Sequence, residues 1–317
     1  MLKIALLNHL GILNITGEDA ASFLQSQLTN DANQLSKDSG QISGYCNHKG
    51  RLLGLFQLIA TDTGFLAITP SEVLESLTKR LQMFVMRSSV TLKNLTESDG
   101  VASIWGDDAA SWLAGRGFQA GAEHYSCRQS TKFPLVTLVR QPGDTDSFLL
   151  LGPKQQLAEF FLESTEKAPA FSHENDWKLE TINNGQPTVV TATSDAFIPQ
   201  MINLDLINGV SFQKGCYPGQ EIVARTRYLG KLKKRMMLFE IDADNSEPVP
   251  VAGDPIMAEG NEQSVGTVVD ASILSGGHYR LLAVIRLAAL EKPLSVNGLE
   301  LSLLELPYAF PTEAEAT

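Results

Sequence analysis

The pattern of apolar and polar residues predicts alternating strands and helices in the first half of the chain. Residues 11–15 alternate as a half-buried strand does, and a helix with one apolar face is expected after Thr16. Two nearly continuous apolar runs, 52–59 and 65–68, are joined by a polar turn and predict a hairpin. A helix is expected over residues 73–84, and a further strand near residues 89–92.

The order strand, strand, helix, strand is typical of a split βαβ module rather than of a Rossmann sheet. The same signals recur later, with strands expected over residues 135–139 and 148–151 and a helix over 155–162. This recurrence indicates a repeated structure, although the sequence itself does not repeat.

After Arg235 the pattern changes to short strands separated by turn sequences rich in Gly, Asp and Asn. The strands are expected over residues 236–241, 264–269, 280–285 and 299–304. This spacing predicts a small antiparallel barrel. The predicted fold class is therefore α+β, with ferredoxin-like split βαβ modules followed by a C-terminal antiparallel β-barrel.

Length and charge limit the domain number and the classes of function. A chain of 317 residues exceeds the size at which one core stops growing, so two or three domains are expected. The net charge of −11 argues against a general nucleic-acid-coating protein, so any such contact must be local.

Residues 1–13 are apolar but interrupted by Asn8 and His9, which favours a first strand over a signal peptide. No run has the length of a membrane span.

The cysteines and histidines predict neither a disulfide framework nor a metal site. The number of cysteines is odd, and the three, Cys46, Cys127 and Cys216, are widely spaced. The five histidines lack the spacing of metal ligands. The Walker, G-x-G-x-x-G, H-E-x-x-H and G-x-S-x-G signatures are missing from the sequence. A reducing cytoplasm is the expected location.

One segment, KGCYPGQE at residues 214–221, concentrates the candidate chemistry. Pro218 suits the first position of a helix that would end at Gly230, so Cys216 is expected just before a helix N-terminus. The helix dipole and the nearby Lys214 both favour the thiolate, which makes Cys216 the candidate reactive thiol and Lys214 the residue that holds it ionised. The alternative is that Cys216 is a small buried hydrophobic residue and that the glycines only shape a turn.

A cluster of cations follows this segment. Residues 225–235 contain six basic side chains in a protein that is acidic overall, namely Arg225, Arg227, Lys231, Lys233, Lys234 and Arg235. A solvated helix end would explain the first two, because the helix dipole favours cations there. The others lie beyond the expected helix end at Gly230. A local contact with an anionic partner, whether polyglutamate, phosphate or tRNA, is therefore expected.

Trp177 is a further candidate, because it follows a polar loop and precedes Leu179 and Ile182. An aromatic residue of the core or of an interface is the interpretation that the sequence alone supports.

The octapeptide, with FIPQM at residues 197–201 and GVSF at 209–212, resembles the signature of the YgfZ family. The resemblance extends to TGEDA at 16–20, CNHKGR at 46–51 and LPY at 306–308, and so spans nearly the whole chain. Proteins of this family are folate-binding relatives of the glycine-cleavage aminomethyltransferase, and their mitochondrial counterparts assist iron–sulfur cluster assembly. The resemblance implies a ring of three domains: residues 1–45 joined with 172–235, residues 46–171, and a barrel of residues 236–317.

The resemblance also implies tetrahydrofolate, or a folate derivative, as the cofactor. Its expected contacts are Trp177, Tyr217, Gln220, Glu221 and Arg225. The family's other folate-lining tryptophan corresponds to Leu10 here, and the glutamate of the transferases' Arg-x-Glu-x-Gly motif corresponds to Asn183. An amide cannot offer two charge-assisted acceptors, which weakens the hypothesis of an enzyme more than the hypothesis of a folate-binding protein.

The resemblance therefore implies a folate-binding accessory protein that supports iron–sulfur cluster enzymes and tRNA thiolation. Its partners would be iron–sulfur enzymes or assembly factors, and it would be non-catalytic or weakly catalytic. Two alternatives stay open: a folate-dependent aminomethyl transferase, and an RNA-binding module that uses residues 225–235.

Overall fold

A computed structural model of the chain describes residues 1–162, 171–228, 230, 232–242, 249–274 and 277–310. Lys231 of the basic segment and Gly276 of one expected turn lie outside the described residues. The chain forms two compact units. Unit 1 comprises residues 1–27, 31–43 and 56–177, and unit 2 comprises residues 28–30, 44–55 and 178–317.

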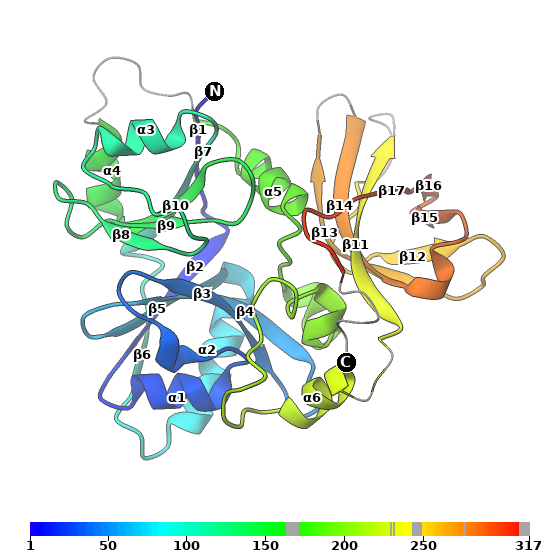
Figure 1. Ribbon diagram of the computed structural model, residues 1–317, viewed down its shortest axis with the longest axis horizontal. Helices are drawn as coiled ribbons and strands as arrows, with labels where there is room; N and C mark the ends of the chain where they lie inside the picture. Colours follow the sequence, from blue (N-terminus) through cyan, green and yellow to red (C-terminus); the bar gives the residue numbers. More distant parts are fainter. Residues whose placement is uncertain (163–170, 229, 231, 243–248, 275–276, 311–317) are drawn as a thin grey trace. The chain divides into compact units, whose positions relative to one another are not determined.

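The first sheet has the predicted split βαβ topology. Its strands run in the order β3-β4-β5-β2-β6, and the helices α1 and α2 follow β2 and β5 in the chain (Figure 1). The elements are β2 (Leu10–Thr16), α1 (Ala20–Gln27), β3 (Gly40–Cys46), β4 (Leu52–Ala60), β5 (Gly64–Pro70), α2 (Ser71–Val85) and β6 (Thr91–Asn94). The expected hairpin is confirmed, since β4 and β5 pair in antiparallel fashion. With β3 set aside, the strand order is that of a ferredoxin-like module.

The apolar face of α2 explains why this helix covers the sheet. Val73, Leu74, Leu77 and Leu81 recur at helical spacing and are all buried. The helix packs against β2 and β5 through this face.

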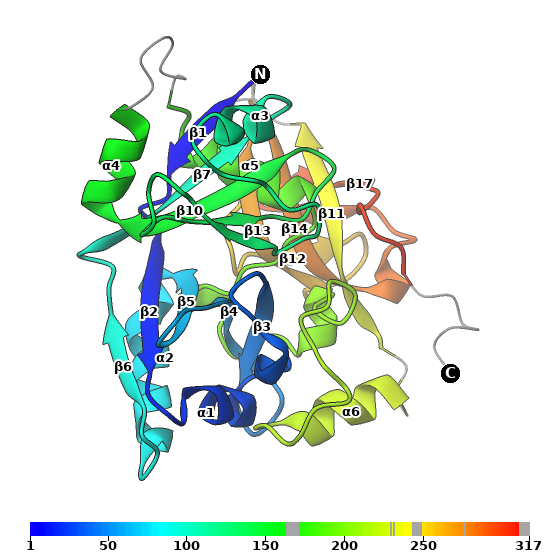
Figure 2. The ribbon, with the colours of Figure 1, turned by 60° about the vertical axis from the view of Figure 1, so that its left-hand side comes forward.

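A second sheet repeats the topology of this module and includes a strand from the N-terminal segment of the chain. Its order is β1-β7-β10-β9-β8, so β1 lies beside β7 where the last strand of a ferredoxin-like module would stand (Figure 2). Its elements are β1 (Lys3–Leu6), β7 (Asp99–Trp105), α3 (Ala109–Ala114), β8 (Cys127–Gln129), β9 (Thr137–Arg140), β10 (Ser147–Pro153) and α4 (Lys154–Leu162). The buried Phe160 on α4 meets the rings of Trp112, Phe118 and Phe133 edge to face. The repetition predicted from the sequence is therefore structural.

The C-terminal part is the predicted barrel. Seven antiparallel strands run in the order β16-β15-β12-β13-β14-β11-β17. Because β16 and β17, at the two ends of this order, are neighbours in the chain, the sheet curls back on itself and is nearly closed. The strands are β11 (Lys234–Asp242), β12 (Pro255–Ala258), β13 (Gly266–Ile273), β14 (His278–Arg286), β15 (Leu294–Val296), β16 (Leu299–Glu300) and β17 (Ser302–Leu304). Apolar side chains such as Phe239, Ile256 and Leu281 fill its interior.

Along the chain, the second module is followed by α5 (Glu174–Asn183), the 3-10 helices Thr191–Thr193 and Pro199–Ile202, and α6 (Gln220–Tyr228), and then by the barrel. Further 3-10 helices are Ala32–Gln34, which follows α1, and Leu287–Ala289, which follows β14. The predicted fold class is confirmed, whereas the division into three domains stays a prediction. Within the part of the chain that the structure describes, no helix is both long and apolar enough to cross a membrane.

Candidate functional site

Cys216 is the exposed thiol of this protein. Cys46 and Cys127 are buried, with 1% and 0% of their surfaces exposed. Burial raises the pKa of each of these two thiols to about 12. A thiolate is the reactive form of cysteine, so neither buried thiol is available for chemistry at neutral pH. The alternative reading of Cys216 as a small buried hydrophobic residue is wrong, because its side chain is exposed.

Lys214 ties the thiol segment to the loop at residues 28–30. Its side chain is buried, and the ammonium donates to the carbonyl oxygens of Leu28 at 2.6 Å and of Asn30 at 3.0 Å. The same ammonium lies 5.2 Å from the ring centroid of Tyr217, which is also buried. These contacts give Lys214 an anchoring role, and its effect on the thiol of Cys216 stays a prediction.

The two glycines of the octapeptide have different surroundings. Gly219 has φ of +79°, and a Cβ there would lie 2.4 Å from the Asn47 carbonyl oxygen and 2.5 Å from the Cα of Gly50. A side chain at Gly219 is therefore excluded by both conformation and space. At Gly215, a Cβ added to the backbone would have no heavy atom within 4 Å, so the chain next to Cys216 faces open space.

The helix after the thiol begins later than the sequence predicts. α6 starts at Gln220, and the carbonyl of Gly219 accepts hydrogen bonds from the amides of Ile222 and Val223. Pro218 therefore precedes the helix instead of occupying its first position, because the left-handed conformation of Gly219 interrupts the backbone between them. Cys216 lies four positions before Gln220 rather than directly at the helix end.

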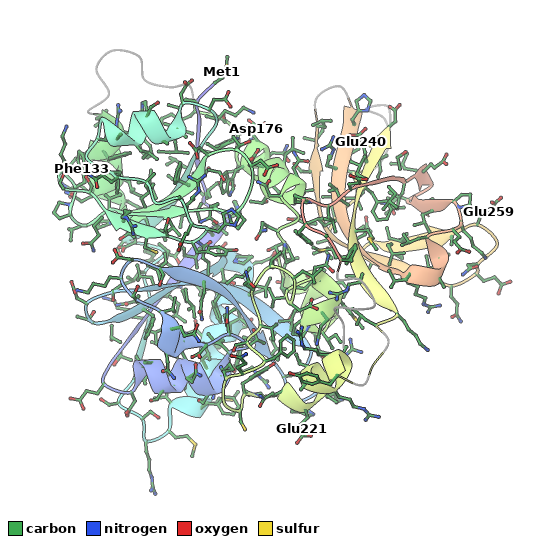
Figure 3. The ribbon with its side chains drawn as sticks, in the orientation of Figure 1. Met1, Phe133, Asp176, Glu221, Glu240 and Glu259 are labelled. Carbon is green, nitrogen blue, oxygen red and sulfur yellow. The ribbon has the colours of Figure 1, made fainter. Side chains whose placement is uncertain are left out.

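The remaining predicted residues of this segment lie on α6. Gln220 is half-buried in the first turn, and Arg225 is exposed. Glu221 is also exposed (Figure 3). A guanidinium on the surface, such as that of Arg225, suits a carboxylate such as the glutamate tail of folate.

The loop of residues 46–51 packs against Gly219 of the thiol segment. The Asn47 side chain donates to Oδ1 of Asp195 at 2.6 Å and accepts from the amides of Lys49 at 2.8 Å and Arg51 at 3.1 Å. Arg51 donates from Nη1 to the carbonyl oxygen of Ala196 at 2.6 Å. Since Gly50 of this loop contacts Gly219, two segments that are distant in sequence pack against each other, three residues after Cys216. The spacing of polar residues gave no sign of this pairing.

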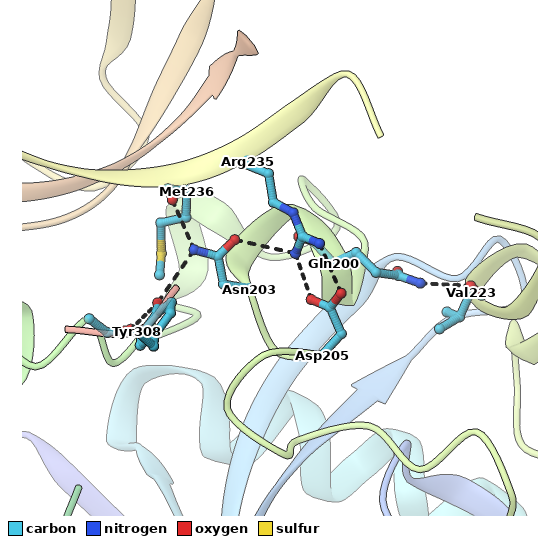
Figure 4. A network of polar contacts seen from close by, with 8 residues as sticks. Gln200, Asn203, Asp205, Val223, Arg235, Met236 and Tyr308 are labelled. Atoms are coloured by element: carbon cyan, nitrogen blue, oxygen red, sulfur yellow. Dashed lines mark hydrogen bonds and ion pairs between the residues drawn. The ribbon is translucent and has the colours of Figure 1, made fainter. Parts of the chain in front are cut away.

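One of the predicted basic residues is part of a buried network. Arg235 makes a two-pronged ion pair with Asp205, with Nη1–Oδ1 and Nη2–Oδ2 distances of 2.6 and 3.0 Å (Figure 4). It also donates to the carbonyl of Gln200, while Asn203 donates to the carbonyl of Met236. The expectation that Arg235 contacts an anionic partner is thus corrected, because its guanidinium is already paired inside the protein.

The other basic residues stay at the surface. Arg225, Arg227 and Lys233 are exposed. The pKa of Lys234 is lowered by partial burial and then by the positive charges of Arg286 and Arg51. Lys234 is the register partner of Arg286 across β11 and β14. The basic surface therefore includes two arginines from outside the segment that the sequence singled out.

Trp177 lies in α5 and is 4% exposed. Its ring meets that of Trp105 edge to face, with centroids 5.4 Å apart, and Leu10 packs in the same cluster. This is the core aromatic that the sequence alone suggested, and its role in folate binding stays a prediction.

Asn183 ends α5 and faces the barrel. Its Oδ1 accepts a hydrogen bond of 2.8 Å from Arg280 of β14, which also pairs with Glu240. The amide that replaces the transferases' carboxylate is thus occupied by a structural contact. Among the described residues, no group of three or more His, Cys, Asp or Glu side chains is placed to hold a metal ion.

The two split βαβ modules and the C-terminal barrel together form an architecture that is also found in an aminomethyltransferase. The structure of aminomethyltransferase T of the glycine cleavage system from Bartonella henselae matches it with a TM-score of 0.67 and 15% sequence identity. The match covers 96% of this chain and 86% of that one. At this identity the likeness concerns the fold alone. Residues 233–309 match the C-terminal β-barrel domain described for CAF17.

The chain belongs to the YgfZ family. A protein of Aliivibrio fischeri named tRNA-modifying protein YgfZ is 30% identical over 284 residues, which cover 88% of this chain and 83% of the relative. A protein of the same name from Colwellia psychrerythraea is 30% identical over 249 residues, covering 76% and 72% of the two chains. The resemblance recognised in the sequence motifs is thus confirmed.

Proposed function

We propose that this protein is a folate-binding accessory factor for tRNA modification and that it supports iron–sulfur enzymes, with Cys216 as the working thiol. The observation that carries the proposal is the exposure of Cys216 on a segment that is otherwise firmly anchored. Lys214 holds one end of the segment to the loop at residues 28–30, and Gly219 packs the other end against residues 47–50. A rigid support for one accessible nucleophile is typical of a functional thiol.

The name shared by the relatives supports the tRNA part of the proposal, since they are called tRNA-modifying proteins. Folate and iron–sulfur enzymes follow from the family resemblance. When bound, a reduced folate would supply one-carbon chemistry or serve as a ligand that stabilises the fold. In this chain Arg225 suits the acidic tail of folate, and Trp177, Tyr217, Gln220 and Glu221 are the other proposed contacts.

Asn183 favours binding over one-carbon transfer. An Arg280-bound amide offers no carboxylate for the donor edge of a pterin. We therefore expect no turnover above background when formaldehyde or methylene-tetrahydrofolate production from methylated amines is assayed. Measurable turnover would support the transferase alternative instead.

The thiol role is tested by complementation. Cys216→Ala should fail to restore thiolated nucleosides in the tRNA of a deletion strain, as measured by mass spectrometry. Cys127→Ala is the matched control, because it removes a thiol that is buried and chemically silent. Full restoration by Cys216→Ala, at wild-type protein levels, would remove the thiol from the proposal.

Folate binding is tested separately by titrating tetrahydrofolate while following tryptophan fluorescence. The protein contains three tryptophans, so the wild type is compared with Trp177→Phe and with Trp112→Phe. We expect a saturable signal that Trp177→Phe weakens and Trp112→Phe retains. A signal that does not depend on folate concentration would contradict folate binding.

A further inference from the structure

An exposed aromatic ring stands among cations at the end of α6. Tyr228 is 65% exposed, and its ring meets that of Phe212 edge to face at 6.3 Å. The guanidinium of Arg227 lies 4.3 Å from the centroid of Phe212. A cation stacked on one ring beside a second, open ring is an arrangement that can take a further flat group.

Cations from three distant segments gather in the same compact unit. Arg225 and Arg227 lie on α6, Lys233 and Lys234 lead into β11, and Arg286 ends β14 opposite Lys234. The amide of Leu287, next to Arg286, donates to the carbonyl of Lys233. Arg51 is close enough for its charge to disfavour the protonated form of Lys234, and its neighbour Gly50 contacts Ile222 of α6.

Most of these cations lack an ion-pair partner in the part of the chain that the structure describes. Among the described residues, no ion pair is formed by Arg225, Lys233, Lys234 or Arg286, whereas Arg235 is paired with Asp205. Gathering like charges is unfavourable, so the surface gains stability when an anion with several charges binds to it.

We propose that Tyr228 and the cations Arg227, Lys233, Lys234, Arg286 and Arg51 form a surface that binds an unpaired segment of RNA. A base stacks on Tyr228, and the cations contact neighbouring phosphates. This inference rests on the proposed role in tRNA modification and specifies how the RNA is held. Cys216 precedes α6, so the thiol and the RNA surface belong to the same compact unit.

An acidic protein segment would also be attracted by the cations, but it would not require a flat, open ring. Base stacking is worth about tenfold or more in affinity for each base. It also favours single strands, because the faces of paired bases are covered by their neighbours. The exposed ring of Tyr228 therefore decides between the two kinds of partner.

The test measures the affinity of the full-length protein for a labelled, unstructured RNA oligonucleotide by fluorescence anisotropy. The wild type should bind the single strand more tightly than the same strand annealed to its complement. Tyr228→Ala should weaken single-strand binding about tenfold or more, and Tyr228→Phe should retain it, since the ring remains. Phe84→Ala is the matched control, because Phe84 is an exposed aromatic of unit 1 at 42% exposure.

The contribution of the cations is tested by measuring how RNA affinity depends on salt concentration. Lys233→Gln and Arg286→Gln should each lower the slope of log affinity against log salt by about 0.7. Lys93→Gln, an exposed lysine of unit 1, should leave the slope unchanged. Cys216→Ala should bind RNA as the wild type does, so a failure of RNA binding and a failure of the thiol role are separate results.

Two outcomes would overturn the inference. One is equal binding of single-stranded and duplex RNA together with indifference to Tyr228→Ala. The other is binding of polyglutamate as tight as that of RNA, with an affinity that Tyr228→Ala does not change. This result would identify an acidic protein segment as the partner.

Discussion

At the residue scale, the three thiols differ in their access to solvent and in their readiness to ionise. Cys216 is exposed, whereas Cys46 and Cys127 are enclosed by apolar neighbours that disfavour the thiolate. Reactivity with an alkylating reagent depends on both properties. Of the three thiols, Cys216 is therefore the one that we expect to react.

We expect iodoacetamide to label Cys216 in the folded protein while Cys46 and Cys127 stay unmodified near neutral pH. In denaturant all three should react at similar rates, because the difference comes from burial. Mass-spectrometric mapping of labelling over time provides the measurement. Labelling of Cys216 no faster than the other two would show that the thiol is not reactive in the folded state.

Lys214 differs from an exposed lysine because its ammonium is held by two carbonyls. Lys214→Met keeps the length of the side chain but leaves the carbonyl oxygens of Leu28 and Asn30 without this donor. Hydrogen bonds to a charged group contribute about 2 kcal/mol, so the free energy of unfolding should fall by about that amount. Urea denaturation measures the change, and Lys233→Met, at an exposed position, serves as the control. Equal stabilities of the two variants would rule out the anchoring role.

At the scale of elements, the turn before α6 has one glycine that the backbone requires and one that it does not. Gly219→Ala should destabilise the fold by about 3 kcal/mol or more, because the conformation is left-handed and the backbone of residues 47 and 50 blocks the added carbon. Gly215→Ala should change stability by no more than about 0.5 kcal/mol, since it meets nothing.

Thermal or chemical denaturation of the two glycine variants distinguishes them. If Gly215→Ala folds normally yet fails to support tRNA modification, the open space beside Cys216 is needed by a ligand or partner. If Gly219→Ala is as stable as the wild type, the framework between residues 47–50 and the octapeptide is not formed as described.

The junction between residues 200–205 and the barrel depends on Arg235. Arg235→Lys retains the charge but loses the two-pronged pairing with Asp205 and the bond to the Gln200 carbonyl. Breaking a largely buried pair costs about 3 kcal/mol, and we expect a loss of stability of that order for Asp205→Ala. Arg235→Lys should lose less, because an ammonium can still approach one oxygen. Denaturation curves that are unchanged in both variants would contradict this account.

At the scale of the whole molecule, the buried thiols make stability depend on alkaline pH. The pKa values of Cys46 and Cys127 are raised from 9.0 to about 12 in the folded state, so the unfolded chain releases these protons first. The stabilisation is complete below about pH 9 and is lost as the pH rises toward 12. At about pH 10 each thiol should lower the free energy of unfolding by about 1.4 kcal/mol relative to neutral pH.

Urea denaturation at neutral pH and at about pH 10 tests this dependence. The double variant Cys46→Ala/Cys127→Ala should lose less stability with rising pH than the wild type, because the two titrating groups are gone. Cys216→Ala should follow the wild type. The same pH dependence in the double variant would show that other groups are responsible.

Much of this protein was determined by the sequence itself. Periodicity predicted many of the strands and helices, among them the β4–β5 hairpin, α2 and the barrel strands β11 and β14, because an element must turn its apolar face to a core whatever lies beyond it. It did not predict β3, β7, α3, β8, β12 or β15. The octapeptide at residues 214–221 also identified the exposed thiol and the family. These are local properties, in which a few neighbouring residues decide the outcome.

Only the tertiary structure decided which residues meet. It joined β1 to the second module, paired Arg235 with Asp205, and brought Arg51 and Arg286 toward Lys234. It also placed Trp177 against Trp105 and Gly219 against Gly50. Periodicity along the chain identifies the face of an element that is buried, but it does not say which distant element packs against that face. The role of a charged or aromatic residue, as anchor, core or binding surface, is therefore settled only in the folded protein.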